Sequence, residues 1–463
     1  MTEDLIKQID ALFHPESIAI VGVPRGMKTG KLFLLALLDQ GFPGQIYPVH
    51  PKADEIDGLK AYPDVKSIPG PVDLVIILVP QHLSLDIIKD CAAKKGVKGA
   101  VLFTAGYKET GTEEGKELEK EIVRVARAAG MRLIGPNCMG LYSPESGLSF
   151  FPNLPREPGK VGLISHSGSL ANILARTATT KGIRFSKAVS LGNECDLKAA
   201  DFLSYLGQDP NTGVIGAYLE GIQKGPFFLE ALRKASINKP VILWKIGSTP
   251  EGSDAAASHT GALAGSWGIW EGVARQGGAT RVAGYEAWTD ALMGFSLLPS
   301  ELGDRMAVIS GPGGLAVSSA EAIGRAGLKL AELTEDTKAA LSKVVPPTGT
   351  SLRNPVDVGL TASLDMDIYI QSVRCTAQDE NVDSMLIVGI GLDPEANKRF
   401  VAAMIEARQE FGKPFIMINV PGFDPALAGN YCQAGLPAFD SAERAMTTYA
   451  QIRRYQKWRE AHK

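Results

Sequence analysis

The chain has 463 residues, of which 45% are hydrophobic and 21% are charged, and its formal net charge is −3. This length exceeds what one hydrophobic core usually organises, so it predicts a globular protein of two to four domains. Because the chain has no basic block, no apolar run near the roughly 18 residues of a membrane span and no apolar signal segment, we expect no nucleic-acid partner, no membrane span and no secretion.

The first part of the chain alternates apolar strand patterns with amphipathic helix patterns. Strands are predicted at residues 17–21, 45–49, 74–79, 99–103 and 132–135, and helices at 31–40, 83–95 and 113–129. Such alternation is typical of a parallel sheet with helices on both faces. The sequence therefore predicts a first α/β domain at residues 1–143.

A Gly-rich loop at residues 22–31 joins the first predicted strand to the first helix. A loop of this kind, placed before a helix N-terminus, cradles phosphate groups. The dinucleotide pattern GxGxxG is not met because Pro24 stands at its second glycine. The P-loop pattern is not met because Arg25 stands where its upstream glycine belongs. The loop thus indicates a nucleotide without identifying it.

The end of the second predicted strand carries Lys52 and no carboxylate. NAD sites usually place Asp or Glu there, whereas a cation suits a phosphorylated ribose, as in CoA or NADP. A solvated lysine in a tight turn is the other interpretation. Cys138 as a nucleophile is disfavoured because no histidine lies near it in the sequence. We predict a cofactor site formed by Gly22, Pro24, Arg25, Gly26, Lys52, Val79, Pro80, Asn137 and Cys138.

Two further α/β units follow, separated by a Pro-rich stretch at residues 142–159 and a boundary at 298–304. The second unit has predicted strands at 160–165, 185–190, 214–219 and 240–245, and a helical segment from Ser266. The third has predicted strands at 305–310, 384–389 and 414–419. The predicted domains are therefore residues 1–143, 157–298 and 303–463, each built on a parallel sheet.

His259 lies after the last strand of the second unit, in a predicted loop of Ala, Ser and Gly residues. Small neighbours leave space for a bulky group on the ring, such as a phosphoryl group, and allow close backbone approach. The alternative is an ordinary surface loop with an ordinary histidine.

Four motifs in order point to a family: residues 135–138 (Gly-Pro-Asn-Cys), 165–170 (Ser-His-Ser-Gly-Ser-Leu), 219–221 (Leu-Glu-Gly) and 258–261 (Ser-His-Thr-Gly). Together they resemble the α subunit of NDP-forming acyl-CoA synthetases, in the succinyl-CoA synthetase superfamily, and specifically the ADP-forming acetyl-CoA synthetase type. The resemblance covers essentially the whole chain. It implies a Rossmann-like CoA-binding domain followed by two flavodoxin-like domains.

The resemblance also implies a reversible reaction in three stages. Acyl-CoA and phosphate give an acyl phosphate and CoA, the phosphoryl group moves to a histidine, and the phosphohistidine passes it to ADP. By the match of motifs, His259 is that histidine, and Glu220 is the carboxylate that hydrogen-bonds its other ring nitrogen. A neutral imidazole is a good phosphoryl acceptor near pH 7.

The phosphohistidine needs anion stabilisation, which two predicted helix N-termini supply through backbone N–H groups and the helix dipole. In the family, two such helices face the phosphorylated ring. The matching phosphate-binding residues are Ser167, Gly168 and Ser169 in the second domain and Gly313 and Gly314 in the third.

Three α/β domains use up the chain, so no segment remains for the ATP-grasp module of this family. The resemblance therefore implies a separate ATP-grasp β subunit that holds ADP or ATP with Mg, in a hetero-oligomer that we expect to be a heterotetramer. The substrates are small molecules, an acyl-CoA and phosphate. The sequence leaves open the acid (acetate, a branched-chain acid or an aryl acid), the direction of flux and the choice between ADP and GDP.

The five cysteines are far apart and form no CxxC pair, which argues against structural zinc and disulfides and favours a cytoplasmic protein with no metal site of its own. Two other functions stay open. An NADP-binding oxidoreductase explains only the first domain, and a non-catalytic CoA-binding protein leaves His259 idle. A serine hydrolase is disfavoured because neither Ser165 nor Ser167 lies in a GxSxG motif.

Overall fold

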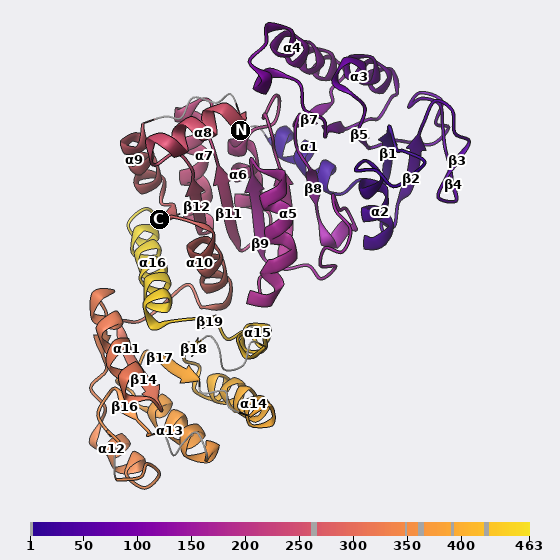
Figure 1. Ribbon diagram of the computed structural model, residues 1–463. Coiled ribbons are helices and arrows are strands. Elements are labelled where there is room, and N and C mark those ends of the chain that lie inside the picture. Colours follow the sequence, from indigo (N-terminus) through magenta and orange to yellow (C-terminus); the bar gives the residue numbers. More distant parts are fainter. Residues whose placement is uncertain (1–2, 261–265, 348–349, 360–364, 390–392, 421–425) are drawn as a thin grey trace. The chain divides into compact units, whose positions relative to one another are not determined.

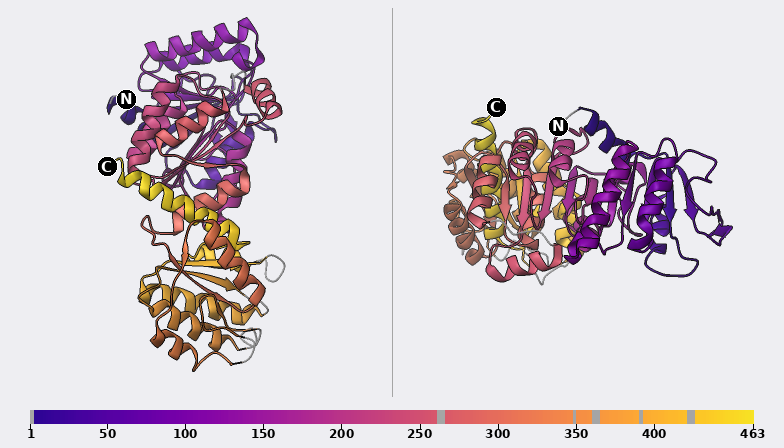
Figure 2. Two further views of the ribbon diagram at one scale, coloured as in Figure 1. Left: turned by 90° about the vertical axis from the view of Figure 1, so that its left-hand side faces the viewer. Right: turned by 90° about the horizontal axis from the view of Figure 1, so that it is seen from above.

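The computed structural model describes residues 3–260, 266–347, 350–359, 365–389, 393–420 and 426–463, without the side chains of 256–260. The chain forms two compact units (Figure 1). The first unit comprises Met1–Thr177 and Arg184–Ala283, and the second comprises Ala178–Ile183 and Gly284–Lys463. Each unit is an α/β structure on parallel-dominated sheets, as predicted. Figure 2 shows helices packed against the sheets of each unit.

The first sheet has five parallel strands in the order β2-β1-β5-β6-β7. Every residue of β1, β5 and β6 is buried, because helices cover both faces of the sheet. The order reverses between β1 and β5, which makes a switch point at that place. The strands are β1 (Ser17–Val21), β2 (Gln45–Val49), β5 (Leu74–Ile77), β6 (Gly99–Leu102) and β7 (Arg132–Ile134), with a small hairpin of β3 (Glu55–Ile56) and β4 (Leu59–Lys60).

The helices of this part follow the predicted order. Helix α2 ends where Gly41 adopts φ 69°, a left-handed conformation that suits glycine. Helix α4 begins where the side chain of Thr112 accepts the N–H of Gly115, a normal N-cap. Helix α1 at the N-terminus was not predicted. The helices are α1 (Glu3–Phe13), α2 (Lys31–Gln40), α3 (Ser84–Ala93) and α4 (Glu113–Ala128), with short 3-10 turns η1 (Gln81–Leu83), η2 (Lys108–Thr110) and η3 (Pro144–Ser146).

The second sheet, in the same unit, has the order β13-β12-β11-β9-β10-β8. All of its pairs are parallel except β10 with β8. Its members are β8 (Gly140–Tyr142), β9 (Val161–Ser165), β10 (Phe185–Ser190), β11 (Val214–Leu219), β12 (Val241–Lys245) and β13 (Thr280–Val282), with helices α5 (Gly168–Thr177), α6 (Ala199–Gln208), α7 (Gly225–Asn238), α8 (Pro250–Thr260) and α9 (Trp267–Gly277).

Three connections tie the two sheets together. Strand β8 directly follows the first sheet in the sequence but adds an antiparallel edge to the second. The backbone after β10 runs along the backbone after β7, with hydrogen bonds from Cys195 N to Gly135 O (2.9 Å) and from Asn193 N to Pro136 O (2.9 Å). Helix α1 packs on α6, where the rings of Phe13 and Tyr205 stack at 5.5 Å. The carboxyl ends of both sheets therefore meet inside one unit.

The predicted loop around His259 was wrong in its secondary structure. Residues 250–260 form helix α8, which includes the position of His259. The alanine run at 255–257 explains the difference, because alanine has the highest helix propensity. The side chain of His259 and the whole of residues 261–265 lie outside the described residues.

The second unit is built on a parallel sheet in the order β15-β14-β17-β18-β19, with β16 also paired to β14. The long helix α16 packs on α10 and α11. The elements are α10 (Tyr285–Leu297), β14 (Arg305–Ser310), α11 (Gly313–Arg325), β15 (Lys329–Leu330), α12 (Glu335–Leu341), β16 (Val356–Asp357), α13 (Met366–Gln378), β17 (Ser384–Gly389), α14 (Pro394–Phe411), β18 (Phe415–Asn419), α15 (Leu427–Gln433), β19 (Ala438–Phe439) and α16 (Ala442–Glu460), with η4 (Ala178–Lys181).

Candidate functional site

The switch point of the first sheet brings two predicted cofactor residues together. Gly22 follows β1 with φ 92°, and a Cβ atom there would lie 2.9 Å from Cγ1 of Val79, which follows β5. Only glycine fits, because both the conformation and the space exclude a side chain. The backbone therefore stays open at the edge where doubly wound sheets bind nucleotides.

Two cations lie beside this glycine loop. The guanidinium of Arg25 donates to the carbonyl oxygen of Lys52, so these two predicted cofactor-binding residues are neighbours, and both are exposed. Lys31, by contrast, is only 4% exposed, and its ammonium pairs with Asp57 at 2.7 Å. Lys31 is thus a buried, paired residue of the loop, whereas Arg25 and Lys52 are exposed to solvent. Asp57 was missed, because nothing in its sequence context marks it as a partner of the loop.

A chain of hydrogen bonds leads from the switch point along the sheet edge. The hydroxyl of Thr104, after β6, donates to the carbonyl of Val79 at 2.9 Å. The N–H of Asn137, after β7, donates to the carbonyl of Thr104 at 3.1 Å. The predicted residues Val79 and Asn137 are therefore linked through Thr104, a residue that the sequence analysis did not select.

A pocket of about 400 Å³ lies at the end of this edge, between the two sheets of the unit. Loops after β6 and β7 form one wall, and loops after β9 and β10 form the other. Gly192 is needed at the junction because a Cβ atom there would lie 2.1 Å from the carbonyl oxygen of Pro136. The lining residues are Phe103, Thr104, Ala105, Asn137, Cys138, Met139, His166, Ser167, Gly168, Ser169 and Gly192.

The N-terminus of helix α5 opens into this pocket, and it carries the predicted phosphate-binding residues Ser167, Gly168 and Ser169. The hydroxyl of Ser167 accepts the N–H of Leu170 at 3.3 Å and lies 3.2 Å from the hydroxyl of Ser169. A helix start of this kind presents N–H donors and a positive dipole end to an anion. The pocket therefore has the chemistry to hold a phosphate group.

Cys138 lies in the same pocket but is only 3% exposed. Burial raises the pKa of its thiol to about 12, so the thiol stays protonated near neutral pH. Its sulfur lies 3.4 Å from the carbonyl oxygen of Leu102. A protonated, buried thiol is a poor nucleophile. The geometry agrees with a lining role for Cys138.

A partly buried polar cluster holds the two walls together. The ammonium of Lys108 lies 3.1 Å from the carboxylate of Glu119 and donates to the backbone carbonyl of Asn193 at 2.5 Å. The amide of Asn193 donates to Glu109 at 2.5 Å and to Glu119 at 3.1 Å. Asn193 follows the lining residue Gly192, so the cluster sets the spacing of the walls. These residues are far apart in the sequence, and no motif could have revealed them.

Glu220 follows β11 at the same carboxyl edge and is only 5% exposed. Burial and the neighbouring carboxylate of Glu220 both raise the pKa of the Tyr218 hydroxyl. The strand register pairs Leu219 with Lys245. Burial lowers the pKa of the Lys245 ammonium below its usual value, and the negative charge of Glu220 partly opposes this shift. Glu220 therefore lies in a buried, charged setting one residue beyond its strand.

Helix α8, which contains the position of His259, packs against η2, a few residues after the pocket wall formed by Phe103–Ala105. In the second unit, Gly313 and Gly314 begin helix α11 as predicted. A Cβ atom on Gly313 would lie 2.7 Å from a carboxylate oxygen of Asp357, so this helix start already has an acidic neighbour.

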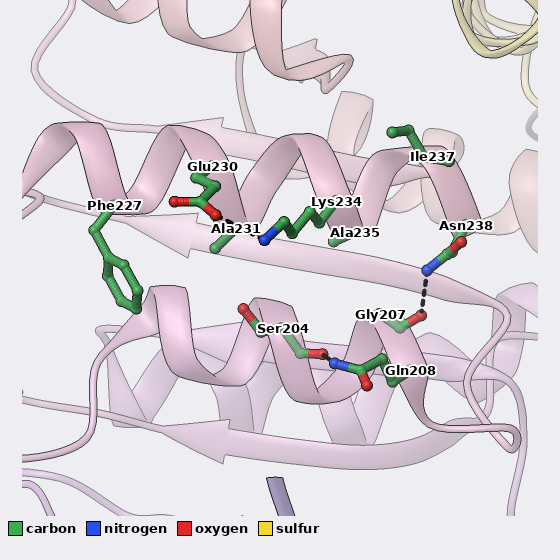
Figure 3. Close-up of a pocket in the computed structure, with 10 residues that line it drawn as sticks. All are labelled: Ser204, Gly207, Gln208, Phe227, Glu230, Ala231, Lys234, Ala235, Ile237 and Asn238. Atoms are coloured by element: carbon green, nitrogen blue, oxygen red, sulfur yellow. Dashed lines mark hydrogen bonds and ion pairs between the residues drawn. The ribbon is translucent and has the colours of Figure 1, made fainter. Parts of the chain in front are cut away.

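A second hollow, of about 460 Å³, lies between α6 and α7 (Figure 3). Its polar groups pair locally: Lys234 with Glu230 at 2.7 Å, and the amide of Gln208 with the carbonyl of Ser204 at 3.0 Å. It contains none of the predicted site residues. Although it is larger, we regard the pocket at α5 as the functional one, since predicted site residues line that pocket and none lines this hollow.

Among the described residues, no helix is long and apolar enough to cross a membrane. Over the same residues, no group of three or more His, Cys, Asp or Glu side chains could hold a metal ion.

Comparison with known proteins gives two family matches. Residues 16–144 match a CoA binding domain, and residues 158–295 match a succinyl-CoA ligase like flavodoxin domain. The α subunit of ADP-forming acetate–CoA ligase II from Pyrococcus furiosus is 36% identical over 96% of this chain and 97% of its own length. ADP-forming acetate–CoA ligase II from Archaeoglobus fulgidus is 33% identical over 98% of this chain but only 68% of its own length.

A solved structure is similar over nearly its whole length. It is the dinucleotide forming acetyl-coenzyme A synthetase 1 of Ca. Korarchaeum cryptofilum in complex with phosphate and ADP, with a TM-score of 0.87 and 34% identity. The match covers 98% of this chain and 97% of that one.

Proposed function

This chain belongs to the family of ADP-forming acyl-CoA synthetase α subunits, a family of acid–thiol ligases, and from that premise we propose how it acts. We propose that the α5 pocket binds the acyl end of an acyl-CoA together with phosphate, and that His259 carries the phosphoryl group onward. The main support is the pocket itself, where loops of the CoA binding domain meet a helix N-terminus. A pocket of this kind can hold a thioester and a phosphate anion next to each other, which favours the reaction between them.

CoA fits the edge of the first sheet. The open backbone at Gly22 admits a pyrophosphate, and Arg25 and Lys52 suit the phosphate on the ribose. The pantetheine arm then follows the edge past Val79 and Thr104 to Asn137, which delivers the thioester to the pocket. The hydrogen bonds among these residues form a continuous path.

The chemistry then has two balanced steps on this chain. A phosphate oxygen attacks the thioester carbonyl, the carbon–sulfur bond breaks, and CoA leaves as thiolate, which takes up a proton. A ring nitrogen of His259 next attacks the phosphorus of the acyl phosphate, and the carboxylate leaves. The N-terminus of α5 stabilises the charge that develops on the phosphate oxygens. Glu220 hydrogen-bonds the other ring nitrogen and stabilises the imidazolium.

We propose that ADP and Mg bind to a separate ATP-grasp subunit. About a third of the length of the Archaeoglobus fulgidus relative lies outside its match to this chain, and other relatives are named α subunits. In the second unit, Gly313 and Gly314 begin helix α11, whose N-terminus offers backbone N–H donors to an anion. The subunits would form a hetero-oligomer, as a heterotetramer, in the cytoplasm.

The test uses the purified full chain with labelled phosphate and a panel of acetyl-CoA, a branched-chain acyl-CoA and an aryl acyl-CoA. We expect an acid-labile, base-stable label on the chain with at least one of them. ATP should form from ADP only when the ATP-grasp partner is added. A chain that forms ATP alone would refute the partner, and a chain that takes up no label from any acyl-CoA would refute the phosphohistidine.

A further inference from the structure

His166 has no role in the function described so far, although it lines the α5 pocket within the Ser-His-Ser-Gly motif. It lies in the loop between β9 and α5, and its side chain is only 5% exposed. A buried imidazole needs hydrogen-bond partners on both nitrogens, because an unsatisfied polar group inside a protein is costly. Its two nitrogens face two different loops of the same sheet edge.

The first partner is the backbone of Glu220. Its N–H donates to Nδ1 of His166 at 3.1 Å. A backbone N–H is always a donor, so Nδ1 must carry a lone pair and no proton. The N–H of His166 in turn donates to the carbonyl of Tyr218 at 3.1 Å. His166 thus fixes the end of β11 at two points, on either side of Leu219.

The second partner is Glu194, in the loop after β10. One of its carboxylate oxygens lies 3.2 Å from Nε2 of His166, and its side chain is 6% exposed. Among the described residues, Nε2 of His166 has no partner with good hydrogen-bond geometry. Its polar contact is therefore the one with the carboxylate of Glu194. A carboxylate only accepts, which places the single ring proton on Nε2.

Several contacts hold Glu194 in place. It has φ 54°, a left-handed conformation that is uncommon for a residue with a side chain and persists only where its surroundings enforce it. Its carboxylate also accepts the N–H of Ala199 at the start of α6, at 2.6 Å. These contacts hold the carboxylate of Glu194 in place as the acceptor that faces Nε2 of His166.

We propose that His166 is a positioning residue that holds Glu220 for phosphoryl transfer, with its tautomer set by Glu194. The proposal rests on the role proposed above for Glu220. If Nδ1 is lost, the N–H of Glu220 loses its buried acceptor, and the backbone that carries the carboxylate is free to shift. A protonated Nδ1 would have the same effect, because two donors would then face each other.

The test compares His166→Ala with His166→Gln in the full chain. The glutamine amide can accept from the N–H of Glu220 and donate to Glu194, so it is the conservative replacement. The measured quantity is the rate of label uptake from phosphate with the acyl-CoA that labels the wild type, beside the Kd for CoA. We expect His166→Ala to label roughly 10- to 100-fold more slowly, as for a small misplacement of a catalytic group, with an unchanged Kd for CoA.

His166→Gln should restore most of that rate. The double variant His166→Ala with Glu220→Gln should be no slower than Glu220→Gln alone, because the two residues act as one unit. Wild-type labelling by His166→Ala, failure of His166→Gln to restore the rate, or independent losses in the double variant would overturn the proposal. If the wild type takes up label but Glu220→Gln labels normally, the role of Glu220 fails instead.

A spectroscopic measurement covers the case in which His166→Ala does not fold. The chain is labelled with 15N in its histidine rings, and the signals that disappear in His166→Gln are assigned to His166. We expect an unprotonated Nδ1 and a protonated Nε2. An Nδ1–H tautomer or a doubly protonated ring would overturn the proposal without any measurement of activity.

Discussion

The carboxylate of Asp196, in the loop after β10, pairs with the guanidinium of Arg132 on β7, with 2.8 Å between Oδ2 and Nε and 3.0 Å between Oδ1 and Nη2. The same carboxylate accepts the N–H of Leu133 at 2.9 Å and pairs with Arg127. Its side chain is completely buried. This two-point pair joins the two sheets whose loops form the α5 pocket, so the spacing of the pocket walls depends on it.

Asp196→Asn should destabilise the first unit by about 3 kcal/mol, because it leaves the guanidinium of Arg132 without its charged partner. Burial would raise the pKa of Asp196, but Arg132, the N–H of Leu133 and Arg127 lower it below its usual value. Because the pKa of Asp196 is lower in the folded state than in the unfolded state, its ionised carboxylate stabilises the fold at every pH above the unfolded-state pKa, which is near 4. This stabilisation is lost as the pH falls through the folded-state pKa. Thermal unfolding from pH 7 down to pH 3 measures both effects.

The control for this prediction is Glu113→Gln, which removes an exposed pair with Lys116 on α4. Exposed pairs contribute little to stability, so its unfolding temperature should stay close to that of the wild type. Equal unfolding temperatures for Asp196→Asn and Glu113→Gln would show that the Asp196 pair does not join the sheets.

Lys52→Ala should weaken CoA binding roughly 10-fold and dephospho-CoA binding much less, since the lost contact is a charged one to the ribose phosphate. Isothermal titration with both ligands measures the difference. Lys95→Ala is a suitable control, because Lys95 is exposed and lies between α3 and the amino end of β6, whereas the predicted site is at the carboxyl ends of the strands. Equal losses for both ligands in Lys52→Ala would count against its contact with that phosphate.

His259→Ala should abolish both the acid-labile label and net ATP formation in the presence of the partner, because no other group is proposed to carry the phosphoryl group. His462→Ala, which changes an exposed histidine at the end of the chain, should keep both. Labelled phosphate with acid and base quenches distinguishes phosphohistidine from phosphoserine. Label in His259→Ala, or a stable label at Ser167, would reverse the mechanistic proposal.

Glu220→Gln should label slowly and to a low level. Glutamine still accepts a hydrogen bond but lacks the charge that stabilises the imidazolium, a loss of about 2–4 kcal/mol in the transition state. Rapid-quench measurement of the labelling rate tests this at saturating acyl-CoA and phosphate. A labelling rate equal to that of the wild type would exclude a role for the carboxylate.

Cys138 should resist alkylation in the folded chain. With a pKa raised by burial to about 12, only about one thiol in ten thousand is ionised at pH 8. Cys375, which is partly exposed, serves as the internal comparison and should react faster. Mass spectrometry after iodoacetamide treatment measures both sites. Rapid modification of Cys138 at pH 8 would restore the nucleophile interpretation that the sequence analysis disfavoured.

Much of the fold could be predicted from local patterns. The predicted strand at 17–21 and helix at 31–40 match β1 and α2 residue for residue, because burial on both faces gives unbroken apolar strands and a glycine ends the helix. The loop around His259 was the main error, since alanines flanking a histidine read equally well as a mobile loop and as helix α8. The domain boundaries and the roles of the site residues stay predictions.

The sequence by itself determined the α/β class and, through four ordered motifs, the family. It could not separate CoA from NADP at Lys52, because both cofactors present a ribose phosphate to the same cation. Only the tertiary structure decided that Gly22 touches Val79, that Asn193 and Asp196 join two sheets, and that His166 lies between Glu194 and Glu220. Those pairs are formed where the carboxyl ends of separate parallel strands meet. Their partners lie tens of residues apart, and no local periodicity records which strand ends become neighbours.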